Sequence, residues 1–64
     1  MKYARKIIIT ESIHYEVGQE LDTKGTISQI KITYPLAKIF VKGNAIPVLE
    51  VFLQVGSVIE WLEE

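Results

Sequence analysis

Short runs of β-branched and aromatic residues, separated at regular intervals by glycine or proline, are the feature of this sequence that most limits its fold. Residues 6–10 read KIIIT, and residues 26–34, 37–42 and 48–55 have a similar composition. Short runs of this kind, bounded by turn-forming residues, are typical of β-strands. The sequence therefore predicts a mainly β domain, built as a strongly bent antiparallel sheet of four or five strands.

Within these runs the apolar residues alternate, which assigns one face of each strand to the core. In the second run Ile30 and Ile32 share a parity that Ile27 does not, and a β-bulge near Ser28 and Gln29 would return Ile27 to the core face. Along the fourth run the inward parity extends from Leu49 to Val55. We therefore expect a core composed of Ile7, Ile9, Ile30, Ile32, Ile39, Val41, Leu49, Val51, Leu53 and Ile59.

The connections between the runs carry recognisable turn signals. Residues 11–19 are mixed and polar, which predicts a long excursion after the first strand. Residues 22–25 read DTKG, a type I turn with Asp first and Gly fourth. Pro35 ends the second strand, and Gly43 with Asn44 predicts a two-residue hairpin, because both residues tolerate positive φ. In that hairpin register Lys42 pairs with Ala45.

The C-terminal residues change to a helical period. Ser57 and Glu60 have the spacing of a capping box, just after Gly56. One helical stripe at i, i+3, i+4 and i+7 is formed by Val55, Val58, Ile59 and Leu62. We expect a short helix from about residue 58. An alternative makes residues 45–64 one long helix, with Asn44 as its cap, but the alternation from residue 49 to 55 argues against it.

Together these elements predict one small domain over residues 1–64, similar in strand spacing and in its long first loop to an SH3-like barrel closed by a short C-terminal helix. This likeness concerns the fold alone and does not indicate a function.

The domain is too small to bury a large core. A chain of 64 residues buries only about 60% of the surface that it exposes when unfolded. Its composition includes no cysteine, so neither disulfides nor thiolate metal sites can add stability, and 48% of its residues are hydrophobic. These properties favour stabilisation by self-association or by a partner protein. The lack of cysteine also fits a reducing compartment, so we expect a cytoplasmic protein. The apolar run at residues 7–9 is far too short to span a membrane.

The residues that carry chemistry are few and scattered. His14 is the single histidine, and it has only Glu11 and Glu16 as close acidic neighbours in the sequence. A catalytic triad or a metal site needs more partners than these. The glycines are isolated turn residues, so no phosphate-binding loop is present. We therefore expect no catalytic, metal or cofactor site, and no enzyme.

One strand face has the composition of a nucleic-acid interface. If Ile39 faces the core, then Lys38, Phe40 and Lys42 share the outer face, and Lys31 has the outward parity of its own strand. A ring between ammonium groups can stack on a base while the lysines meet phosphates. Against this, the net charge of the whole chain is −1, whereas nucleic-acid binders are usually basic.

A second set of residues with outward parity is apolar and indicates a protein interface. It consists of Phe40, Val48, Phe52 and Trp61. Aromatic residues are enriched in the cores of interfaces, although the same side chains can instead pack within one chain.

Charge is also uneven along the sequence. Residues 1–42 carry seven basic and four acidic residues, a balance of +3, and residues 43–64 carry four acidic and no basic residues, a balance of −4. Such asymmetry can mark a basic face and an acidic face, or it can let the two parts of one chain attract each other. In a dimer, the acidic C-terminal residues could also meet the basic stretch of the neighbour and steer association.

The sequence therefore favours a small non-enzymatic protein-interaction module, a regulator or inhibitor that binds a partner protein or itself, with a homodimer as the favoured assembly. The alternative is a small β-barrel that binds nucleic acid through Lys31, Lys38, Phe40 and Lys42. Salt dependence separates the two, because phosphate contacts weaken steeply as salt rises.

Overall fold

The computed structural model describes residues 3–62 as seven β-strands with no helix. In chain order the strands are β1 (Tyr3–Ile8), β2 (His14–Glu16), β3 (Glu20–Leu21), β4 (Gly25–Thr33), β5 (Leu36–Val41), β6 (Leu49–Phe52) and β7 (Val58–Trp61).

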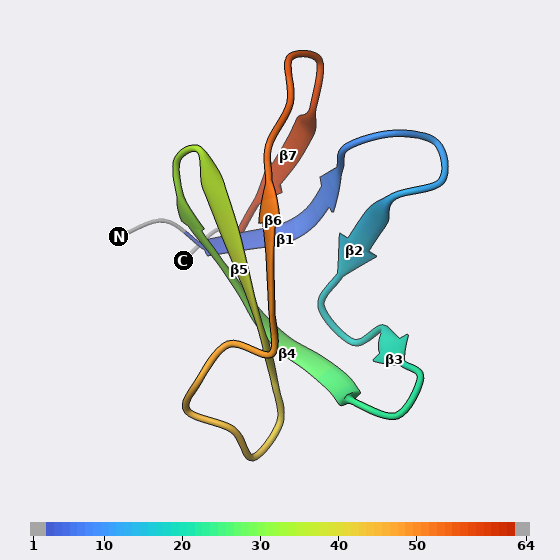
Figure 1. Ribbon diagram of the computed structural model, residues 1–64, viewed down its shortest axis with the longest axis vertical. Coiled ribbons are helices and arrows are strands. Elements are labelled where there is room, and N and C mark those ends of the chain that lie inside the picture. The colour runs from blue at the N-terminus through green and yellow to red at the C-terminus, as the bar shows by residue number, and fades with distance from the viewer. Residues whose placement is uncertain (1–2, 63–64) are drawn as a thin grey trace.

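All strand pairs are antiparallel and form one curled sheet. The main order is β2-β1-β4-β5-β6, while β3 extends the pairing of β4 and β7 pairs with β1. β1 is thus paired along both edges, with β4 and β2 on one side and β7 on the other. Figure 1 shows how the sheet bends around one side of the molecule, so that the strands form a half-barrel.

The core lies on the inner face of this half-barrel. Ile39 is opposite Ile30 on one side and Leu49 on the other, so one cross-strand row runs through the centre of the sheet. The predicted core is confirmed: Ile7, Ile9, Ile30, Ile32, Ile39, Val41 and Leu53 are buried, and Leu49, Val51 and Ile59 are partly buried against them. Ile27 also joins the core.

Two alanines that are absent from the predicted core set complete the core, although the alternation of the third run places Ala37 on the same face as Ile39 and Val41. Ala4 and Ala37 are fully buried in β1 and β5, opposite Ile30 and Ile32 respectively. A small side chain gives little hydrophobic signal, although its Cβ faces the same side as its larger neighbours.

The predicted bulge in the second strand is confirmed. The β4–β5 register shifts between Ile27 and Gln29, and the shift places Ile27 in the buried set with Ile30. An extra residue in one strand reverses the alternation of its side chains, which is why Ile27 and Ile30 face the same side despite their different parity.

The turn before β4 lies one residue earlier than predicted. The N–H of Lys24 donates to the carbonyl of Leu21 at 2.6 Å, so residues 21–24 form the turn. Asp22 takes a positive φ of 35°, and Leu21 is paired with Gly25 at the base of the β3–β4 hairpin. Asp adopts this backbone region more readily than most residues.

The predicted hairpin at Gly43 and Asn44 is wrong. β5 ends at Val41 and β6 begins at Leu49, so residues 42–48 form a longer connection. The N–H of Asn44 donates to the carbonyl of Val41 at 3.2 Å, which makes a local turn without starting a strand. A strand directly after the turn would have to include Pro47, which has no N–H for the ladder.

The fourth strand is also shorter than predicted, and the inward assignment of Val55 is wrong. β6 ends at Phe52, and Val55 is fully exposed in the connection to β7. The N–H of Ser57 donates to the carbonyl of Gln54 at 3.0 Å, so the chain turns just after the strand.

The predicted C-terminal helix is wrong, and so is the alternative helix over residues 45–64. Val58 to Trp61 form strand β7, in which Ile59 is opposite the buried Ile7 of β1. The open edge of β1 decided the structure of these residues more than the helical spacing of the four apolar residues did. Pairing with β7 satisfies backbone groups of β1 as well as those of β7, whereas a helix would satisfy only its own. Val58 and Ile59 are also β-branched, which favours strands.

Candidate interaction surfaces

The outer face of the sheet carries a cross-strand row of charged side chains. Lys31 in β4 is directly opposite Lys38 in β5, and Lys38 is in turn opposite Glu50 in β6. Tyr3 of β1 is opposite Lys31 and extends the row. Like charges directly opposite each other destabilise a sheet, and opposite charges stabilise it. Lys38 therefore has one unfavourable and one favourable neighbour.

The structure brings three of the four predicted nucleic-acid residues onto this face. Phe40 follows Lys38 at the next outward position of β5 and is opposite Gln29, while Lys31 is opposite Lys38. Lys42 is exposed just beyond β5, where its N–H donates to the carbonyl of Thr26 at 3.0 Å. Tyr3 was not predicted, because its neighbourhood with Lys31 depends on long-range pairing.

The outer face also carries an apolar surface. It lies where the first residue of β5 is opposite the last residue of β6. Phe52 is 68% exposed and is opposite Leu36, which is half-buried. Tyr34, 78% exposed, lies in the turn that leads into β5. We call Tyr34, Leu36 and Phe52 the Phe52 patch.

The four predicted interface residues occupy different places. Phe40 and Phe52 share the outer face but lie at opposite ends of the β5–β6 pair, and Val48, just before β6, is half-buried like Phe40. Trp61 is on β7, which β1, β4 and β5 separate from β6 in the sheet. The predicted outward position of Trp61 is wrong, because Trp61 is opposite the buried Ala4 and lies on the inner-face side of its strand.

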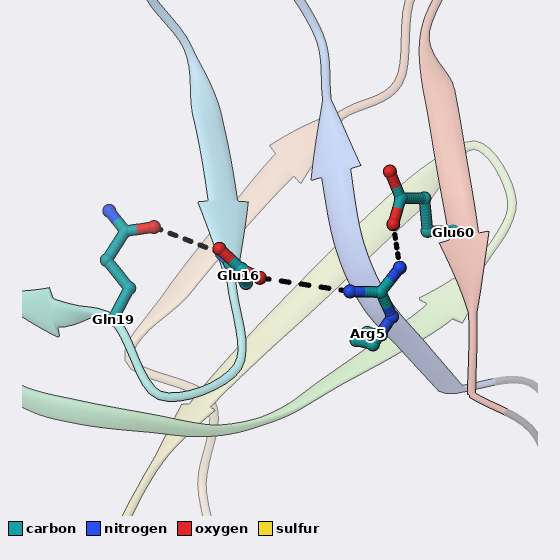
Figure 2. A network of polar contacts seen from close by, with 4 residues as sticks. All are labelled: Arg5, Glu16, Gln19 and Glu60. Atoms are coloured by element: carbon teal, nitrogen blue, oxygen red, sulfur yellow. Dashed lines mark hydrogen bonds and ion pairs between the residues drawn. The ribbon is translucent and has the colours of Figure 1, made fainter.

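A polar network connects β1, β2 and β7 (Figure 2). Arg5 of β1 contacts Glu60 of β7, and its Nη1 lies 3.9 Å from Oε2 of Glu16 in β2. Oε1 of Gln19 accepts a hydrogen bond from the N–H of Glu16 at 3.0 Å. These side chains are partly exposed, and ion pairs in such positions contribute little to stability.

Two hollows lie away from these surfaces, and one of them is lined partly by polar residues. One of about 180 Å³ is lined by Leu49 and Tyr15 and by residues 21–24, and another of about 360 Å³ lies along residues 44–48. Among residues 3–62 no polar or charged residue is buried, and no group of His, Asp and Glu side chains is arranged to hold a metal ion. His14 is exposed in β2, opposite Ile8.

Comparisons with models of protein families, with characterised proteins and with solved structures find no significant match to this chain. Within residues 3–62 there is no helix capable of crossing a membrane.

Proposed function

We propose that this protein is a small non-enzymatic interaction module that acts in the cytoplasm by binding protein, as a regulator or inhibitor. Its partner is a second protein, a second copy of itself, or both in turn, and a homodimer is the favoured assembly.

The observation that carries this proposal is the exposure of Phe52. A phenylalanine ring on the outer face of a sheet gains nothing from exposure to water, and burying it releases about 1.5–3 kcal/mol. Leu36 directly opposite and Tyr34 in the adjoining turn enlarge the apolar area. Exposed apolar patches on small proteins are typical of interaction sites.

We further propose that the half-barrel is of the SH3-like type. Three features support this architecture: β1 pairs with the last strand, a long excursion over residues 9–24 follows β1, and β4, β5 and β6 form a meander. In such a barrel the outer surface and the loops, rather than the filled interior, are available to partners.

Light scattering over a hundredfold dilution series tests the interaction proposal. We expect a mass above that of one chain at high concentration, and we expect Phe52→Glu to reduce it to one chain while circular dichroism shows an intact fold. Ile46→Glu is the matched control, because Ile46 is also an exposed large apolar residue but lies in the connection of residues 42–48. A single-chain mass for the unmodified protein throughout, or equal effects of both variants, contradicts the role of the patch.

Nucleic-acid binding is the second candidate, and the pairing of Lys31 with Lys38 favours it. Two ammonium groups held on opposite strands repel each other, and a phosphate between them would relieve that repulsion. Phe40, at the next outward position, offers a ring for base stacking.

Titration with a single-stranded oligonucleotide at several salt concentrations tests this candidate. Lys38→Gln should weaken binding and lower the slope of log affinity against log salt by about one unit. Lys24→Gln is the control, because Lys24 lies in the turn before β4 and away from the row. Absence of binding at low salt excludes the candidate.

A further inference from the structure

The outer edge of β6 has unpaired backbone. β6 pairs with β5 alone among the described strands. The N–H of Leu53 donates to the carbonyl of Pro35 at 2.8 Å, so Leu53 directs its N–H toward β5. Because backbone groups alternate along a strand, Val51 also bonds toward β5. Glu50 and Phe52 then direct their N–H and C=O groups to the free edge.

The free edge is limited at its C-terminal end by a local turn. The N–H of Gln54 donates to Oγ of Ser57 at 2.9 Å, and the carbonyl of Gln54 accepts the N–H of Ser57 at 3.0 Å. The next outward-directed residue after Phe52 therefore has its backbone groups occupied. Glu50 and Phe52 remain as the pairing positions of the edge.

We propose that β6 pairs antiparallel with β6 of a second copy, across a twofold axis that passes beside Val51. In this register Glu50 of each copy is opposite Phe52 of the other. The N–H and C=O groups of Glu50 in one copy then face the C=O and N–H groups of Phe52 in the other. A twofold interface requires this kind of self-complementary contact. This inference rests on the self-association proposed above and names the contact that produces it.

The neighbouring registers are less favourable. An axis at Glu50 places two carboxylates directly opposite each other, which destabilises the pair. An axis at Phe52 places Glu50 opposite Gln54, whose N–H and C=O groups are already bonded to Ser57. The axis at Val51 avoids both problems, and it places the two Val51 side chains against each other on the inner face.

The side chains of this edge also favour pairing. Natural edge strands are commonly protected by charged side chains, proline, a bulge or short length. Residues 49–52 read LEVF, a short strand with no lysine or proline and with Glu50 as its one charged residue. Pairing covers part of the exposed ring of Phe52 and joins two half-barrels into one continuous sheet. A contact between two four-residue strands is small compared with a standard interface, so we expect a weak dimer that forms at high concentration.

Backbone N-methylation in a chemically synthesised chain tests the contact without changing a side chain. N-methylation of Phe52 removes a donor of the free edge and should weaken the dimer about tenfold or more in sedimentation equilibrium. The matched control is N-methylation of Ile46, in the connection between β5 and β6, which should leave the dissociation constant unchanged.

An isotope-mixed sample locates the axis directly. Half of the chains are labelled, and NMR then detects contacts between copies. Directly opposite residues in a non-hydrogen-bonded antiparallel pair bring their Cα atoms to about 4.5 Å. We therefore expect a strong intermolecular contact between the Hα atoms of Val51 in the two copies.

The outcomes separate the two proposals. If Phe52→Glu abolishes the dimer but N-methylation of Phe52 does not, the patch mediates self-association and the edge pairing is wrong. A dimer without the Val51 contact also overturns the edge pairing. If the unmodified protein has the mass of one chain at every concentration, self-association itself fails, and the edge pairing fails with it.

Discussion

Truncation of Leu53 to alanine tests the packing between β6 and the rest of the core. Leu53 follows the last residue of β6, is 8% exposed and belongs to the core cluster. Removing most of a buried leucine side chain costs about 2–5 kcal/mol, from the lost transfer energy and from the cavity left behind. Because Leu53 lies at the end of a strand, where neighbours can collapse into the space, we expect the lower half of this range, about 2–3.5 kcal/mol.

This loss is large for so small a domain. A single core of this size supplies only about 3–5 kcal/mol of net stability. For a small chain the urea m-value is about 1 kcal/mol/M, so the midpoint of unfolding should fall by about 2–3.5 M. Urea titration followed by circular dichroism measures the shift, with a stabilising osmolyte present in all samples if the variant is partly unfolded in water.

Leu62→Ala is the matched control, because it is the same substitution at a leucine that is 46% exposed. We expect it to cost less than half as much as Leu53→Ala. A loss below about 1 kcal/mol for Leu53→Ala, or equal losses for the two variants, would show that Leu53 is not packed in the core.

Two further substitutions test the network and a turn. Arg5→Gln removes the cation between Glu16 and Glu60. Since these side chains are partly exposed, the loss in the free energy of unfolding should be at most about 1 kcal/mol and should shrink as salt rises. A loss that is unchanged in high salt would exclude an electrostatic origin. Gly25→Ala should cost about 1–2 kcal/mol, because Gly25 has a φ of 117° while an added Cβ would meet Val41 at an ordinary 3.5 Å. D-alanine at the same position accepts positive φ, so a synthetic chain with that residue should recover most of the loss in the same urea titration, and equal destabilisation by both forms would point to a steric cause.

The core was predictable from the sequence because buried strand positions hold apolar residues at every second position. Ile30 and Ile32 alternate with polar residues, and the sheet requires that alternation to be kept. Even the bulge was detectable, since Ile27 broke the parity of its own strand. Ala37 shares the parity of Ile39 and Val41, so its face was predictable, but Ala4 had no comparable signal because alanine is common on both faces.

The C-terminus could not be predicted, because a local pattern competed with a distant partner. Val58 and Ile59 fit a helical stripe and a strand equally well over so few residues. The outcome depended on β1, which offers an open edge some fifty residues earlier in the chain. The position of Trp61 opposite Ala4 also depends on the pairing of β7 with β1.

The candidate surfaces were predictable in part. The outward parity of Phe40, Phe52 and Lys38 follows from each strand alone, and the structure agrees with it. The neighbours across strands do not follow from one strand. The Lys31–Lys38 pair depends on the β4–β5 register, and the opposition of Leu36 and Phe52 depends on a connection longer than the predicted hairpin.

The pairing of β1 with β7 has a consequence for the order in which the chain can fold during its synthesis. β4 and β5 are joined by a short turn and can pair as soon as both have left the ribosome, whereas β1 must wait for β7, the last of the strands in residues 3–62. Until then one edge of β1 has no partner strand, and Ile7 lacks its cross-strand neighbour Ile59. Closing so long a loop is slow compared with forming a local hairpin. The nascent chain therefore carries an open strand edge from the synthesis of β1 until β7 has been made, an interval in which a chaperone can bind it.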